Sequence, residues 1–193
     1  NQLFGTCSAG GGSELTQIYG TVFVIDLSKV SPADNAAGFG VLHYFGDPSG
    51  QFTDANPKGA LFLASDGNLY GTTYYFGGTV FQIKPDAGGH FSVTARTSPS
   101  GKDTFNGTYT KIYDFSNDTG QSPLAGVIQG PGGFLYGTTA GGGSTSDGTV
   151  YKVGTDGHGY TLLHSFSGGG VFSGDPPGDG YNPQCDLLFA SDG

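Results

Sequence analysis

The chain has 193 residues, enough for one domain with a hydrophobic core, and its 35% hydrophobic content can fill that core. Its net charge of -9 disfavours partners that are themselves anionic, such as nucleic acids and acidic lipid surfaces. No apolar run approaches the roughly 20 residues that a membrane-spanning helix requires, so we expect no membrane insertion. The 38 glycines and 10 prolines interrupt every window long enough for a substantial helix, which favours an all-β fold.

Four short apolar runs recur in the same order in three consecutive copies. Each copy has a Leu-aromatic-Gly-Thr string, a Gly-Thr-Val-aromatic string, a run ending in phenylalanine, and a run introduced by a proline. In chain order the runs are 3–6, 20–23, 41–45 and 60–64, then 69–72, 78–81, 111–115 and 124–128, then 135–138, 148–151, 162–166 and 187–190. The copies therefore span roughly residues 1–67, 68–133 and 134–193.

Each run is rich in β-branched or aromatic residues and is bounded by Gly, Asp, Asn or Pro, which predicts four antiparallel strands per copy. The turn at 65–68 centres on Asp-Gly and predicts a two-residue hairpin that places residue 59 opposite residue 74. The middle copy departs from the pattern over 84–110, where the alternation in 91–95 predicts an added hairpin.

A four-stranded unit of this size cannot bury both faces alone, so the copies are expected to stack face to face. We predict a single propeller-like domain, residues 1–193, of three four-stranded antiparallel blades. The alternative is a β-solenoid, which is disfavoured because a four-strand period is too long for one solenoid coil.

The phrases at 64–73, 148–153 and 163–166 resemble the GloVer tandem repeats of bacterial secreted proteins. The resemblance covers nearly the whole chain, and all its motifs recur in order. It implies a propeller-like, extracellular or surface-anchored repeat protein, and it assigns no catalytic role to any residue of this chain.

The beginning of the chain continues the phrase on which the chain ends. Residues 190–193 match 64–67, and residues 1–6 supply the strand that follows this phrase in the other copies. We therefore predict that the two ends form one shared sheet. Its assembly edge would comprise Asn1, Leu3, Phe4, Leu187, Leu188 and Phe189.

The two cysteines fall at this same junction. In the internal alignment Cys7 and Cys185 lie nearly opposite each other across the shared hairpin, within the distance that a disulfide bond requires. We predict this bond, either within one chain or between chains.

A lone ring of three blades is disfavoured, because each blade would have to turn by about 120° whereas propellers have roughly 4–8 blades. Two chains making six blades, an open head-to-tail series, and a fragment of a longer array all remain open. In the first two cases the partner of the chain is itself, and the donated strand covers a bare sheet edge.

Other features are typical of a protein outside the cell. The chain starts at Asn1 without methionine or a leader, as expected of a mature or excised product. The absence of methionine and tryptophan suits an oxidising compartment. Asn106 and Asn117 lie in N-glycosylation sequons. We therefore predict an extracellular or cell-surface location.

The histidines indicate packing rather than chemistry. His43 and His164 occupy one repeated position, which holds Tyr113 in the middle copy, and repetition is typical of a structural role. His90 and His158 lie beside glycines in turns and are expected to face solvent. No nucleophile elbow, zinc-ligand spacing, phosphate loop or dinucleotide fingerprint is present, so we expect no enzyme activity and no cofactor.

Two alternatives to a self-assembling ring or fibre stay open. Aspartates in the connections before the fourth runs could act in pairs on glycosidic bonds or bind calcium, although no Asp-x-Asp-x-Asp-Gly string is present. These residues are Asp47, Asp54, Asp175 and Asp179. Repeated pockets with some of the eleven tyrosines could instead bind glycans, as in a propeller lectin.

Overall fold

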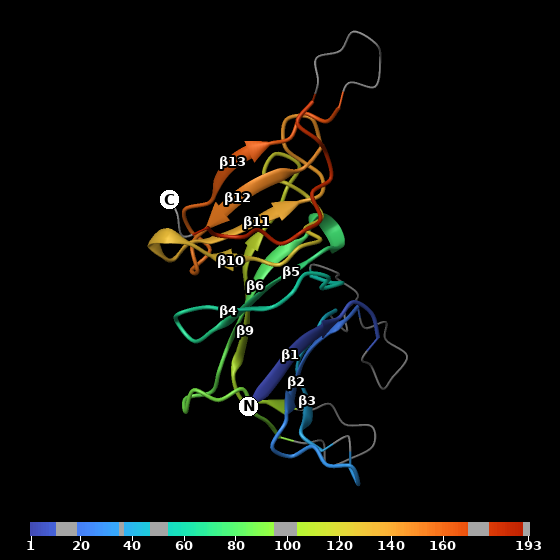
Figure 1. Ribbon diagram of the computed structural model, residues 1–193, viewed down its shortest axis with the longest axis vertical. Coiled ribbons are helices and arrows are strands. Elements are labelled where there is room, and N and C mark those ends of the chain that lie inside the picture. Colours follow the sequence, from blue (N-terminus) through green and yellow to red (C-terminus); the bar gives the residue numbers. More distant parts are fainter. Residues whose placement is uncertain (11–18, 35–36, 47–53, 95–103, 170–177, 191–193) are drawn as a thin grey trace.

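The computed structural model describes residues 1–10, 19–34, 37–46, 54–94, 104–169 and 178–190. Three antiparallel sheets follow one another along the molecule, and a short two-stranded hairpin lies beside the first (Figure 1). The helical part of the described chain consists of two single 3-10 turns, η1 (Tyr75–Gly77) and η2 (Pro131–Gly133). The all-β prediction is confirmed.

The strands fall where the repeated runs place them. The first sheet contains β1 (Gln2–Cys7), β2 (Thr21–Asp26) and β3 (Phe39–Tyr44). The second contains β4 (Phe62–Leu63), β5 (Leu69–Thr73), β6 (Thr79–Lys84) and β9 (Thr108–Asp114), and the third contains β10 (Ile128–Gln129), β11 (Leu135–Thr139), β12 (Thr149–Val153) and β13 (Thr161–Ser165). The added hairpin predicted in the middle copy is present as β7 (Val93–Thr94) and β8 (Thr104–Phe105).

The glycine of the Leu-aromatic-Gly-Thr string is required by its cross-strand neighbour. Gly71 lies opposite Phe81, whose ring crosses over it, and a Cβ on Gly71 would approach the Phe81 ring to 2.5 Å. The same contact joins Gly5 to Phe23 at 2.4 Å and Gly137 to Tyr151 at 2.5 Å. The two strings recur together because the aromatic residue of one packs on the glycine of the other.

The hydrophobic core lies between the sheets. One cluster joins the first sheet to the second, and the other joins the second to the third. The first cluster comprises Val22, Val24, Leu42, Phe45, Leu69, Phe81, Ile83 and Phe91. The second comprises Ala64, Tyr70, Val80, Phe115, Val127, Leu135, Tyr151 and Val153. Copies therefore stack face to face, as predicted.

Two predictions about the fourth runs need correction. The first sheet has three strands instead of four, because residues 187–190 form no strand and do not pair with β1. The hairpin between β4 and β5 has a three-residue turn, since Gly67 adopts a left-handed φ of 79° and the Ala64 amide donates to the Asn68 carbonyl. The register is therefore shifted by one residue, with Leu63 opposite Leu69, and residue 59 does not face residue 74.

Candidate functional site: the two open ends of the repeat

One anchoring device occurs three times, once beside each sheet. A residue in the left-handed region precedes a proline and donates its amide hydrogen to the carbonyl of the residue two positions before the second strand of that sheet. The three bonds run from Asn56 to Tyr19 at 2.7 Å, from Ser122 to Gly77 at 2.7 Å and from Asn182 to Asp147 at 2.8 Å. The φ angles of the three donors are 56°, 57° and 57°.

The proline after each of these residues lies on the glycine that opens a Gly-Thr-Val-aromatic string. A Cβ on Gly20 would meet Cδ of Pro57 at 2.6 Å, and the corresponding distances are 2.3 Å from Gly78 to Pro123 and 2.7 Å from Gly148 to Pro183. Residues 182–183 therefore sit on the third sheet as residues 56–57 sit on the first and residues 122–123 on the second.

Residues 183–190 thus follow the path of an innermost strand for a further sheet. Asp186 accepts a 2.6 Å hydrogen bond from the Gly126 amide, and the Phe189 ring packs edge-on against Tyr136. Unlike β4 and β10, this segment pairs with no strand among the described residues, and Leu188 is 92% exposed. Figure 1 shows it running beside the third sheet, away from β1.

The first sheet presents the matching gap. β1 is an edge strand, whereas its counterparts β5 and β11 pair with β4 and β10. Leu3 on β1 is 54% exposed, while the equivalent Leu69 and Leu135 are almost fully buried. The first sheet therefore lacks the strand that residues 183–190 resemble.

The outer faces of the first and third sheets are also exposed. On the third sheet Leu163 is 47% exposed, although its counterpart Leu42 is buried against the second sheet. On the first sheet Phe39 is 49% exposed, although its counterpart Tyr109 is packed against the core between the first and second sheets. The predicted edge residues differ in their surroundings. Asn1, Leu3 and Leu188 are exposed, and Leu187 is half-buried. Phe4 packs against the core between the first and second sheets, and Phe189 packs on Tyr136.

The two cysteines are free and exposed, and the structure contains no bond between them. A single chain does not test the predicted bond between chains, but the geometry of the repeat argues against it. A Cβ on Gly59, the counterpart of Cys185, would meet the Ala125 backbone of the next sheet at 2.4 Å. Thr73, the counterpart of Cys7, shares a strand face with Leu69, which packs against the preceding sheet. The two positions face opposite sides of the completed sheet, which disfavours a disulfide across it.

The two histidines of the repeated position differ, because the side chain of His164 is 49% exposed and only His43 is packed between two sheets. His43 stacks on Tyr109 with ring centroids 3.6 Å apart and packs edge-on against Phe45. Burial lowers the pKa of His43 to about 4. His90 and His158 are exposed and lie beside Asp86 and Asp156. The packing role of His43 is confirmed.

The two loop aspartates within the described chain contact different sheets. Asp54 accepts a hydrogen bond from Tyr109 of β9, and burial raises the pKa of this carboxyl group. Asp179 accepts bonds from Ser167 and contacts His164 of β13 at 2.6 Å, and the bonds from Ser167 lower its pKa to about 2. These contacts give no support to a catalytic pair of Asp54 with Asp179. Asp47 and Asp175 lie outside the described residues.

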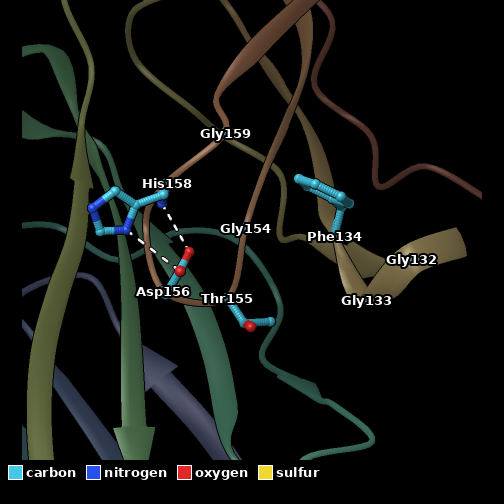
Figure 2. Close-up of a pocket in the computed structure, with 8 residues that line it drawn as sticks. All are labelled: Gly132, Gly133, Phe134, Gly154, Thr155, Asp156, His158 and Gly159. Carbon is cyan, nitrogen blue, oxygen red and sulfur yellow. Dashed lines mark hydrogen bonds and ion pairs between the residues drawn. The ribbon is translucent and has the colours of Figure 1, made fainter.

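A surface cavity of about 320 Å³ lies at the third sheet (Figure 2). Asp156 and His158 line it side by side on one loop, and Phe134 lines it from the segment after η2. The Lys152 ammonium lies 4.8 Å from the centroid of the Phe134 ring. The remaining lining residues are Gly132, Gly133, Gly154, Thr155 and Gly159.

The asparagines of the two sequons, Asn106 and Asn117, are both exposed. Across the described residues, no group of three or more His, Cys, Asp or Glu side chains is arranged to hold a metal ion. The described chain also has no helix with the length and hydropathy needed to cross a bilayer.

Comparison with known proteins identifies the repeat. No curated protein and no solved structure matches the chain. A family model, the Gloeobacter/Verrucomicrobia repeat, matches residues 1–193. This agrees with the three related sheets and the anchor that recurs beside each of them. The chain belongs to the Gloeobacter/Verrucomicrobia repeat family.

Proposed function

We propose that this repeat protein is an extracellular, propeller-like scaffold that joins copies of itself head to tail. In this proposal residues 183–190 of one copy add to β1 of the next copy as its missing innermost strand. The role is mechanical and requires neither catalysis nor a cofactor. Its location outside the cell rests on the composition and the two sequons.

The observation that carries the proposal is the seating of residues 182–190 on the third sheet. The same anchor precedes β4 and β10, and each of those strands pairs with a strand equivalent to β1. Ile128 lies opposite Tyr136 and Gln129 opposite Leu135. Transferred to the junction between copies, this register places Leu188 opposite Phe4 of the second copy and Phe189 opposite Leu3.

A buried hydroxyl group at the third sheet supports this placement. In the second sheet, Thr72 donates a 2.8 Å hydrogen bond to the Ala125 carbonyl of the adjoining segment. Its counterpart Thr138 is 3% exposed, and its hydroxyl has no partner among the described residues. The counterpart of the Ala125 carbonyl is that of Cys185. Docking of a second copy would hold residues 183–190 in place and supply this acceptor, which removes the cost of an unsatisfied buried donor.

The apolar side chains supply the driving force. Leu188 projects from the segment almost fully exposed, whereas its counterpart Phe62 packs against the cluster between the second and third sheets. Burying one leucine contributes roughly 1.5–3 kcal/mol. The backbone groups of an open edge strand gain partners at the same time.

The test is the mass of residues 1–193 in solution, measured by light scattering over a range of concentrations. We expect concentration-dependent association that Leu188→Ser weakens at least ten-fold. The matched control is Phe76→Ser, because Phe76 is 67% exposed but lies in η1, away from both open ends. A protein that stays monomeric at every concentration would refute the proposal. Negative-stain images would then distinguish closed rings of two copies from open fibres.

Carbohydrate binding is a second candidate, favoured by the cavity of Figure 2. An aromatic ring, Phe134, and a carboxylate, Asp156, line one open cavity, and sugars bind to such pairs by stacking and hydrogen bonding. Calorimetric titration with neutral oligosaccharides should give saturable heat that Phe134→Ala abolishes. A glycan array with no signal would reject this candidate.

A further inference from the structure

We infer that two copies also meet face to face, with the His164 ring of one copy stacked on the Phe39 ring of the next. This inference rests on the proposed head-to-tail assembly and names its second contact. The contact involves the open face of the third sheet in one copy and the open face of the first sheet in the other.

The inference starts from an aromatic stack that occurs twice inside the chain. His43 on β3 stacks on Tyr109 on β9, with centroids 3.6 Å apart and an interplanar angle of 5°. Tyr113 on β9 stacks on Tyr160, just before β13, with centroids 4.6 Å apart and an angle of 3°. Each stack joins the outer strand of one sheet to the outer strand of the next.

Strand register identifies the third pair. The valine of the Gly-Thr-Val-aromatic string pairs with the same position of the outer strand in every sheet. The pairs are Val22 with His43, Val80 with Tyr113, and Val150 with His164, so the last three residues are equivalent. Phe39 pairs with Ile25 as Tyr109 pairs with Ile83, so Phe39 is the counterpart of Tyr109. The pattern therefore calls for His164 to stack on a residue in the position of Phe39.

Both members of this third pair are uncovered in the single chain. Phe39 is 49% exposed, and so is the side chain of His164. His164 is already oriented like its counterparts, because it packs edge-on against Phe166 as His43 does against Phe45. Its 2.6 Å contact with Asp179 uses the Nε2 edge and leaves a ring face open for stacking.

The occupant of the third sheet's open face must satisfy two conditions. It must offer an aromatic residue at the position of Phe39, and its sheet must lack an innermost strand, because residues 183–190 already occupy that place. Among the described sheets only the first meets both conditions. A second copy of this chain, which offers Phe39 on such a sheet, is the partner we infer.

Four substitutions test the stack, two that keep an aromatic ring and two that remove it. His164→Tyr and Phe39→Tyr introduce the side chains that stack in the middle of the chain, and both should preserve association. His164→Ser and Phe39→Ser should each raise the dissociation constant about ten-fold, the equivalent of roughly 1.4 kcal/mol. His164 contacts Asp179 and Phe39 stacks on Phe23 within the single chain, so thermal unfolding of each monomer is measured beside association, and only variants that stay folded at the assay temperature are compared.

Cross-linking locates the contact directly. Phe39→Cys and His164→Cys are made separately in a background carrying Cys7→Ser and Cys185→Ser, and the two proteins are mixed with a short bismaleimide. Cross-linked dimers should form in the mixture and not in either protein alone. Replacing the Phe39→Cys protein by a Phe76→Cys protein should give none.

The outcomes separate this inference from the proposed function. If the chain associates but all four swaps are neutral and no cross-link forms, the stack is refuted while strand donation stands. If the unmodified chain does not associate, the proposed function fails first.

Discussion

At the scale of single residues, the repeat preserves shape more strictly than chemistry. His43 and Tyr113 stack at equivalent positions although one is a base and the other a phenol. What the position requires is a flat ring that packs between an outer strand and the next sheet. A histidine at this position makes the stability of the fold depend on pH in mild acid, whereas a tyrosine does not.

We predict that His43→Tyr removes a loss of stability in mild acid. Burial lowers the pKa of His43 to about 4 in the folded protein, against 6.5 ordinarily. Above pH 6.5 the imidazole is neutral in both states. Between pH 6.5 and 4 the unfolded chain binds a proton that the folded chain does not, so stability falls by about 3 kcal/mol across this window.

The measurement is urea unfolding of the original chain and of His43→Tyr from pH 7.5 to 4.5. Tyr109 faces His43, and Asp54 bonds to Tyr109, but both are common to the two proteins. The raised pKa of Asp54 acts in the opposite direction, adding stability as the pH falls. The difference between the proteins therefore isolates His43. Parallel curves over this range would contradict the prediction.

At the scale of elements, each sheet is joined to the next by a glycine and a proline in contact. Gly78 has a φ of 93°, and a Cβ there would meet Cδ of Pro123 at 2.3 Å and the Thr73 carbonyl oxygen at 2.5 Å. Neither backbone nor proline ring can move far in response. The junction therefore tolerates only glycine at this position.

We predict that Gly78→Ala lowers the free energy of unfolding by more than about 2 kcal/mol. Gly67→Ala is the matched control, because Gly67 also has a positive φ, of 79°, but a Cβ there would have no neighbouring atom within 4 Å. That control should lose only the strain of the left-handed backbone, about 1 kcal/mol. Equal losses in urea unfolding would mean that the proline contact contributes nothing.

The cysteines also belong to this scale, because their orientation depends on the strand face. The counterparts of Cys7 and Cys185 face opposite sides of a completed sheet. We therefore expect associated protein to run as a monomer on a non-reducing denaturing gel after free thiols are blocked. A dimer or ladder that disappears on reduction would show that residues 183–190 dock in a different orientation, in which Cys185 and Cys7 face the same side of the sheet.

At the scale of the whole molecule, association must overcome like charge. Each copy carries a net charge of -9, while the open faces are apolar. Salt screens the repulsion between copies and leaves apolar contacts intact. The dissociation constant should therefore fall as the sodium chloride concentration rises from about 50 mM to about 500 mM. Over this range the Debye screening length shortens from roughly 14 Å to roughly 4 Å. A constant that rises with salt would indicate an interface held by opposite charges.

Much of the architecture could be predicted from residue patterns alone. The strands follow from alternating β-branched and aromatic residues, and the glycine of Leu-aromatic-Gly-Thr from its place opposite an aromatic residue. The left-handed residues before the prolines do not follow from the strand pattern, although the Asn-Pro pairs at 56–57 and 182–183 are a visible turn signal. The fourth strands are shorter than the fourth runs predict, because the backbone at the start of these runs, at Gly59 and Gly126, packs against the neighbouring run instead of pairing within its own sheet.

The number of copies, most of their strands and the order of these strands can be read from residue patterns, because each depends on contacts between residues close along the chain or on a repeated pattern. Which surfaces are covered depends on how the sheets pack in three dimensions. Leu3 and Leu69 occupy equivalent positions and differ only in whether a neighbouring sheet lies over them. The same holds for Phe39 and Tyr109. The stacking of the sheets brings together residues far apart in sequence. It leaves one face of the first sheet and one face of the third without a partner sheet within the described chain.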